Sequence, residues 1–392
     1  MVCGMNERTF RVRFLWVRPG VAFAPGELRV SDGRVRGIGP ARRGRIAPVA
    51  IVPGFVNAHA HLQLEALSRP RRQFLPWVRA VMAARRDSTP AGLISAGRAA
   101  LRRMMRDGVV SVGEIDSSGL SPGILGETEV SGLCYQELVG FDLGRKDASA
   151  AVRRRALPGT RFCRAGLSPH APYSVSPALM KACRDHGRPL AIHVAETPEE
   201  VSFLRGGTGP FRDLLEELGK IPGGFRAPGL SPVAWLEQLG MLGPRTSLIH
   251  AQHLEPGDAE RIASSGSPVV VCPGTIRYFR RCPPPVPEWL ELGIPVALGT
   301  DSLGSNAGLS MRAEMQEARQ MWPTLSPQVI LEMATAHGHR ALARPGAGGL
   351  RRGGAASFVV LPCEGDGPEC LEALTSNARA PSQVWLRGRL IS

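Results

Sequence analysis

Lysine and tyrosine are scarce in this sequence, and their scarcity limits the partners that we expect. The formal net charge is +14, yet the only lysines are Lys146, Lys181 and Lys220, and there are 3 tyrosines. The basic residues are therefore almost all arginines, scattered in short groups no longer than the triplet at 153–155. Nucleic-acid-binding proteins cluster their basic residues and interleave aromatic ones. We attribute the charge to arginine-rich solvated faces and expect no nucleic-acid partner.

Cys-x-x-Cys pairs and long apolar segments are also missing. The 8 cysteines are dispersed, and several lie in apolar, strand-like segments. We therefore expect reduced cysteines in the core of a cytoplasmic protein. Residues 1–18 lack the continuous apolar stretch of a signal peptide, and no segment is apolar enough to span a bilayer. The sequence thus predicts no membrane partner.

Several common catalytic motifs do not occur. The sequence contains no Gly-x-Ser-x-Gly elbow, no phosphate-binding loop ending in Gly-Lys-Ser/Thr and no His-Glu-x-x-His helix. The His-x-Glu and Pro-Cys-x-x-Cys signature of cytidine-type zinc deaminases is missing as well. Any catalytic site must therefore be built from other residues.

The most informative segment that is present covers residues 52–61. Its apolar, β-branched run is typical of a buried strand, and it ends in His59 and His61. Because the side chains of a strand alternate between its faces, both histidines leave the same face and can converge on one cation. A pair of structural histidines is the alternative. Residues 189–196, 246–253 and 294–302 also end apolar runs in metal-compatible or proton-transferring residues.

Strand-like segments that alternate with helical ones predict a (β/α)8 TIM barrel. The eight strands are expected at residues 51–58, 108–116, 132–139, 162–168, 190–196, 247–251, 268–273 and 295–301. Residues 9–50, with a hairpin signal at Asp32-Gly33, and residues 354–392 are strand-like again. We therefore expect a small β-sandwich domain built from both termini, 1–52 and 350–392, around a barrel domain over 53–349.

The parallel strands of such a barrel end on one face, which holds the active site. Six of the 9 histidines follow or end predicted strands, together with Glu196 and Asp301: His59, His61, His170, His193, His250 and His253. Three neutral imidazoles and a carboxylate suit zinc, with iron as the second choice, and leave a position for water. The metal lowers the pKa of that water. We expect Glu196 to transfer protons, with a structural salt bridge as the alternative.

The remaining histidines are not expected in this site. His337 and His339 lie on a predicted helix, where residues two apart point roughly 200° away from each other. One metal cannot easily take both. His186 precedes a glycine at a predicted helix end and should be solvated.

These motifs in this order resemble the amidohydrolase superfamily, in particular its mononuclear deaminase and chlorohydrolase branch. The matching segments are 53–61 (PGFVNAHAH), 168–174 (SPHAPYS), 192–197 (IHVAET), 249–254 (IHAQHL) and 298–306 (LGTDSLGSN). The resemblance implies one divalent metal ion, whose ligands are His59, His61, His193 and Asp301. It also implies that Glu196 shuttles protons, that Asp301 accepts the proton of the hydrolytic water, that His250 orients this water and that His170 contacts the substrate.

Within that branch, residues 191–219 resemble the aminodeoxyfutalosine deaminases. This implies hydrolytic deamination of a 6-aminopurine nucleoside derivative in menaquinone biosynthesis. Enzymes that act on S-adenosylhomocysteine or methylthioadenosine share the same frame, so they remain an alternative. Guanine or pterin deamination, triazine dechlorination and a metal-free, non-catalytic scaffold also stay open.

The contacts to the substrate are less well defined by the sequence. Gln63, Leu75-Pro76 and 274–276 depart from the pattern of related deaminases, which often carry a glutamate before Trp77 that holds the ribose hydroxyls. The candidates for further substrate contacts are Trp77, Glu65, Arg145, Arg277 and Ser302. We expect a small-molecule substrate, and the sequence leaves a homodimer open.

Overall fold

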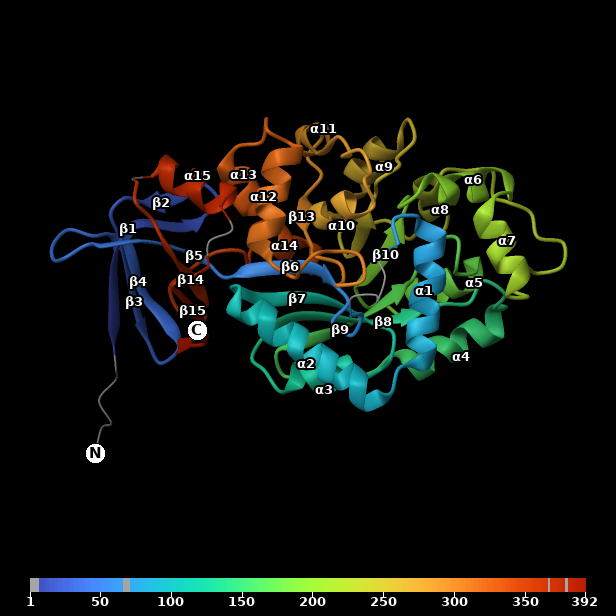
Figure 1. Cartoon of the computed structure of the whole chain (residues 1–392), viewed down its shortest axis with the longest axis horizontal. Helices are drawn as coiled ribbons and strands as arrows, with labels where there is room; N and C mark the ends of the chain where they lie inside the picture. The colour runs from blue at the N-terminus through green and yellow to red at the C-terminus, as the bar shows by residue number, and fades with distance from the viewer. Residues whose placement is uncertain (1–6, 66–70, 366, 378–379) are drawn as a thin grey trace.

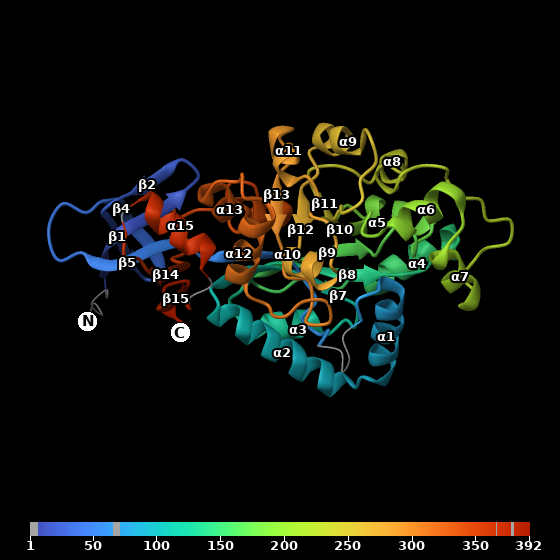
Figure 2. The same cartoon turned by 45° about the horizontal axis from the view of Figure 1, so that its top comes forward.

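The barrel predicted from the sequence is present in the computed structural model, which describes residues 7–65, 71–365, 367–377 and 380–392. Eight parallel strands follow each other in chain order around one sheet (Figures 1 and 2). They are β6 (Phe55–Ala60), β7 (Val109–Asp116), β8 (Ser131–Leu138), β9 (Cys163–Pro169), β10 (Leu190–Val194), β11 (Thr246–His250), β12 (Val269–Val271) and β13 (Val296–Leu298). Apolar side chains such as Val56, Ile115 and Tyr135 fill its interior.

The barrel closes between its first and last strands. Ala60 and Asp301 form a parallel bridge, and the amide nitrogens of Thr300 and Asp301 each donate to the carbonyl oxygen of His59 at 3.1 Å. Gly299 permits this approach, since a Cβ there would lie 2.9 Å from backbone and Cβ atoms of His59. The closure brings Asp301 beside His59 although 242 positions separate them in the chain, as their numbers show.

Helices connect the strands and surround the barrel. Five begin with a Ser or Thr side chain that accepts an amide hydrogen bond and a Pro in the first turn: α2, α5, α6, α8 and α13. The bounds are α1 (Phe74–Asp87), α2 (Pro90–Arg106), α3 (Ser121–Gly126), α4 (Arg145–Arg155), α5 (Pro177–Asp185), α6 (Pro198–Gly206), α7 (Pro210–Glu217), α8 (Pro232–Gln238), α9 (Asp258–Ser265), α10 (Pro273–Tyr278), α11 (Val286–Glu291), α12 (Met311–Met321), α13 (Pro327–Met333), α14 (Ala336–Ala341) and α15 (Pro368–Ser376).

A second sheet combines both ends of the chain, as the sequence predicted. Its path is β16-β15-β14-β5-β1-β3-β4, with β2 paired to β1, and its N-terminal and C-terminal strands lie together beside the barrel in Figure 1. The predicted hairpin turn at Asp32-Gly33 joins β3 to β4. The bounds are β1 (Arg8–Arg18), β2 (Val21–Phe23), β3 (Gly26–Ser31), β4 (Arg34–Pro40), β5 (Ala47–Pro53), β14 (Phe358–Pro362), β15 (Gln383–Leu386) and β16 (Arg389–Leu390).

Two sequence predictions need correction. The segment 51–58 is not one strand, because β5 of the terminal sheet ends at Pro53 and β6 of the barrel begins at Phe55. Not all cysteines are reduced, because Cys363 and Cys370 form a disulfide. Cys134, Cys163, Cys183 and Cys272 are buried thiols, as expected, and Cys282 is exposed. Cys3 lies outside the described residues. Among the described helices, none combines the length and apolarity needed to cross a bilayer.

Candidate metal centre and active site

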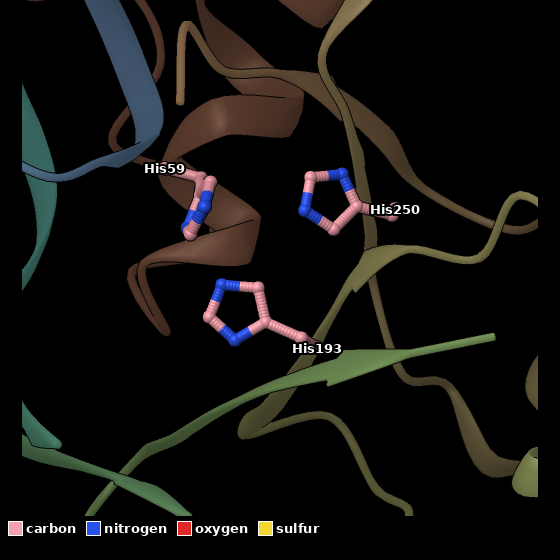
Figure 3. Close-up of side chains that lie close together, drawn as sticks. All are labelled: His59, His193 and His250. Atoms are coloured by element: carbon pink, nitrogen blue, oxygen red, sulfur yellow. The ribbon is translucent and has the colours of Figure 1, made fainter. Parts of the chain in front are cut away.

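Histidine side chains from three barrel strands converge at the carboxyl end of the barrel. His59 belongs to β6, His193 to β10, and His250 ends β11. Their rings face one another in Figure 3, and one ligand nitrogen of each lies within 4.8 Å of the others. A second set with the same mutual spacing joins His59 to His61 and Asp301. The other residues predicted to bind the metal, His61, His193 and Asp301, therefore lie around His59.

The backbone at two of these strand ends is left-handed. The φ angle is 72° at His250 and 56° at Asp301. Side-chain-bearing residues adopt such angles at a cost on the order of 1–3 kcal/mol, so the surroundings must hold them. At Asp301 the amide donates to the carbonyl oxygen of His59, and the Asp301 carbonyl accepts the amide of His61 at 3.2 Å. These contacts fix the Asp301 backbone against both histidines.

The protonation states fit a metal centre. Burial lowers the pKa of both His61 and His250 to about 3 and the pKa of His193 well below its usual value, so these imidazoles are neutral. Burial by itself would raise the pKa of Asp301, but the nearby imidazoles of His59, His61 and His250 lower it. Both ring nitrogens of His59 are buried without a hydrogen-bond partner. Neutral imidazole nitrogens beside a carboxylate are the donor set of a divalent metal.

His193 is oriented by its neighbour. Its Nδ1 lies 3.0 Å from the carbonyl oxygen of His170. A carbonyl can only accept a hydrogen bond, so Nδ1 carries the proton and the lone pair of Nε2 is left for a metal. Nδ1 of His170 is in turn 2.6 Å from Oγ of Ser174.

Glu196 is buried beside the histidines. Its Oε2 lies 3.7 Å from Nε2 of His250, and its Oε1 accepts a hydrogen bond from Nη1 of Arg281 at 3.2 Å. Burial raises the pKa of Glu196 to about 7, although the charge of Arg281 acts in the opposite direction. A carboxyl group with a pKa near neutrality gains and loses a proton readily at physiological pH. This group is therefore suited to proton transfer.

A cavity of about 520 Å³ opens onto this cluster. One wall is formed by apolar side chains of α1, namely Phe74, Trp77, Val78, Val81 and Met82. Another is formed by α7 and the residue after it: Phe211, Leu214, Leu215 and Leu218. His61, His170, His193, Glu196, His250 and Asp301 also line the cavity. Its size and largely apolar walls match a site for a small organic molecule.

The residues predicted to contact the substrate divide into two groups. His170 and Trp77 line this cavity, and Nε1 of Trp77 donates to the carbonyl oxygen of Gly304 at 2.8 Å. Glu65, Arg145, Arg277 and Ser302 do not line it. Glu65 and Arg277 line two other hollows, and Arg277 forms an ion pair with Glu317. Arg145 is exposed at the start of α4. The hydroxyl group of buried Ser302 lies 3.0 Å from that of Ser305.

Sequence reasoning missed several charged groups near the cluster. Glu137, near the end of β8, lines the cavity, and its Oε2 lies 3.2 Å from Nη1 of Arg85 on α1. Burial by itself would raise the pKa of Glu137, but Arg85, His170 and His61 lower it to about 2. Arg281 and Lys220 were missed as well. The one signal for Glu137 in the sequence was its position near the end of an apolar strand. Its partner Arg85 could not be found in this way, because it comes from a distant segment of the chain.

Comparisons with known proteins agree with this arrangement. Residues 50–391 match the model of the amidohydrolase family. The chain is 33% identical over 316 residues to aminodeoxyfutalosine deaminase of Deinococcus radiodurans, covering 75% of this chain and 73% of that protein. It is 30% identical to a 5-methylthioadenosine/S-adenosylhomocysteine deaminase of Nitratidesulfovibrio vulgaris, covering 86% and 79%. The crystal structure of aminofutalosine deaminase from Helicobacter pylori has the same fold, with a TM-score of 0.82, 20% identity and coverage of 98% of this chain and 99% of that chain.

Proposed function

Because the chain belongs to the amidohydrolase family, we propose that it is a metal-dependent enzyme that deaminates a 6-aminopurine nucleoside, with aminodeoxyfutalosine as its substrate. The observation that carries this proposal is the convergence of four metal-compatible residues beside a buried proton-transfer group, Glu196. The Deinococcus radiodurans relative supports the choice of substrate. The reaction converts the nucleoside and water into an inosine-type product and ammonia.

The expected metal is zinc, with iron as the second choice. His59, His61, His193 and Asp301 would hold it, because their donor atoms are neutral imidazole nitrogens and a carboxylate. When bound, such an ion supplies the Lewis acidity that makes water nucleophilic near neutral pH. The unpartnered nitrogens of buried His59 support this assignment.

The protein side chains then handle the protons and the orientation of the reactants. Glu196 delivers a proton to a ring nitrogen of the purine, which makes C6 more electrophilic. His250, 3.7 Å from Glu196, holds the water in line with C6, and Asp301 accepts the proton that the water loses. The oxygen adds to C6, and the amino group leaves as ammonia after it has been protonated. His170 contacts the purine from the wall of the cavity.

The test is ammonia release from a panel of adenine nucleosides: adenosine, methylthioadenosine, S-adenosylhomocysteine and aminodeoxyfutalosine. We expect the highest kcat/KM for aminodeoxyfutalosine. A preference for methylthioadenosine or S-adenosylhomocysteine would select the second candidate function, which the Nitratidesulfovibrio vulgaris relative favours. Ammonia release from guanine or a pterin but from none of these nucleosides would overturn the proposal.

We also propose a division into domains. Residues 53–349 form the catalytic barrel, and residues 1–52 with 350–392 form a small β-sandwich domain. The support is a separate apolar cluster that joins both ends of the chain, with Leu15, Leu28 and Val35 packed among Phe358 and Trp385.

A further inference from the structure

Glu137 is a buried acidic group in the wall of the active-site cavity, and the reaction described above does not use it. It lies one residue before the end of β8, and only 6% of its surface is exposed. It lines the same cavity as His61 and His170. Arg85, which reaches it from α1, stabilises its negative charge. The cavity therefore contains a carboxylate that is separate from the metal ligands and from Glu196.

Other polar groups of the cavity wall are already engaged. Oγ of Ser174 is bonded to His170, and Nε1 of Trp77 donates to a backbone carbonyl. Asp142 and Lys220 pair with each other at 2.9 Å in a half-exposed position. The side chains of α1 that line the cavity are apolar except for Trp77 and Arg85. Among the described residues that line the cavity, Glu137 is the buried carboxylate besides Glu196 and Asp301, and the buried hydroxyl group of Tyr173 lines the cavity as well.

The position of Glu137 suits the sugar of a nucleoside. β8 pairs with β9 in parallel, with Glu137 opposite Ser168, two residues before His170. Glu137 therefore lies on the strand next to the one that leads to His170, and both side chains line the cavity that would hold a nucleoside. An ionised carboxylate only accepts hydrogen bonds, and its two oxygens can take one from each hydroxyl of a vicinal diol. A negatively charged group at this wall would be repelled.

We propose that Glu137 binds the 2′- and 3′-hydroxyl groups of the ribose and thereby makes the enzyme selective for ribonucleosides. This inference rests on the proposed function, since it requires a nucleoside substrate. It assigns Arg85 the role of a positioning residue that holds the Glu137 carboxylate in place through their 3.2 Å contact. Glu65, Arg145 and Arg277, which the sequence offered as further substrate contacts, do not line this cavity.

The test compares kcat/KM for adenosine and for 2′,3′-dideoxyadenosine in the metal-loaded enzyme. The loss of a hydrogen bond to a charged group corresponds to a decrease in kcat/KM of about tenfold to a hundredfold. We expect the wild type to prefer adenosine by a factor in this range. In Glu137→Gln the preference should fall by about tenfold, because activity on adenosine drops while activity on the dideoxy analogue stays nearly constant. General structural damage would instead lower both activities equally.

Glu127→Gln is the matched control, because Glu127 is exposed, pairs with Arg98 and lies outside the cavity. It should keep the wild-type preference. If Glu137→Gln does not fold, Glu137→Asp retains the charge but withdraws it by one methylene, and its preference should fall between those of wild type and a binding-deficient enzyme.

The outcomes separate this inference from the proposed function. A wild type without preference for adenosine, or a wild-type preference in the folded Glu137 variant, would overturn the role of Glu137 while leaving deamination intact. A wild type that releases no ammonia from any adenine nucleoside would overturn the proposed function itself.

Discussion

Oε2 of Glu200 lies 3.0 Å from the backbone nitrogen of Glu196 and accepts its hydrogen bond. Glu200 belongs to the first turn of α6, where its own amide is bonded to Thr197, the residue that caps the helix. A buried carboxyl group thus fixes the backbone of the residue to which we assign proton transfer. Because Glu200 is fully buried, the ionisation of its carboxyl group also makes the stability of the protein depend on pH.

The contribution of Glu200 to stability should decrease as the pH rises through the neutral range. Burial raises the pKa of Glu200 to about 8 from an ordinary value of 4.5. Between these values the folded chain keeps a proton that the unfolded chain has lost, so the free energy of unfolding falls by up to about 1.4 kcal/mol per pH unit. Glu200→Gln removes this contribution. Thermal unfolding of wild type and variant should show the variant gaining relative stability from about pH 5 to pH 8, and a constant difference would contradict the prediction.

His193→Ala should lose metal and activity together. The substitution removes one imidazole from the ligand set and leaves an incompletely filled site. Metal analysis of the purified variant, compared with His186→Ala, provides the measurement, because His186 is exposed at the end of α5. Full metal occupancy in His193→Ala would show that the ligand set is wrong.

Glu196→Gln should retain the fold and the metal but lose turnover by about a hundredfold to ten-thousandfold. The amide has nearly the same shape as the carboxyl group, yet it cannot carry a proton, and a positioned acid–base group contributes this range. Ammonia release under saturating substrate is the measurement, with Glu199→Gln, in the first turn of the helix that follows Glu196, as the control. Wild-type turnover in Glu196→Gln would remove this residue from the mechanism.

Arg281→Met should move the pH profile of kcat/KM to higher pH. The charge and hydrogen bond of Arg281 lower the pKa of Glu196, which burial otherwise raises, so removing them lets that pKa rise above about 7. The limb of the kcat/KM profile that reports the ionisation of Glu196 should therefore shift to higher pH. Arg280→Met is the control, because Arg280 is exposed and lines a different hollow. Identical profiles for wild type and Arg281→Met would contradict the assignment.

Lys220→Met should weaken the preference for a substrate with a distal carboxylate. Lys220 is the lysine that lines the cavity, beyond the apolar residues of α7. Because it is half-exposed and paired with Asp142, we expect a loss of about threefold to tenfold in kcat/KM for aminodeoxyfutalosine. Methylthioadenosine has no carboxylate and should be unaffected. Lys146→Met, outside the cavity, is the control; equal losses on both substrates would argue against this contact.

The sequence by itself determined the barrel and the identity of the metal-compatible residues. Strand and helix periodicity depends on neighbouring residues, so the eight strands could be found without knowing their partners. The histidines that end β6, β10 and β11 followed from the same local rule, because the parallel strands of a barrel end on one face. The boundary at Gly54 was missed, since the apolar run continues from one sheet into the other.

Only the tertiary structure decided which charged residues reach the cavity. Arg85 and Glu137 meet there, whereas Arg145 and Arg277 remain outside, and no local pattern distinguishes the two pairs. The same holds for Arg281 beside Glu196 and for the disulfide between Cys363 and Cys370. A long side chain contacts whatever the packing of distant helices and strands brings within a few ångströms, and that packing depends on the whole chain. Local periodicity carries no information about it.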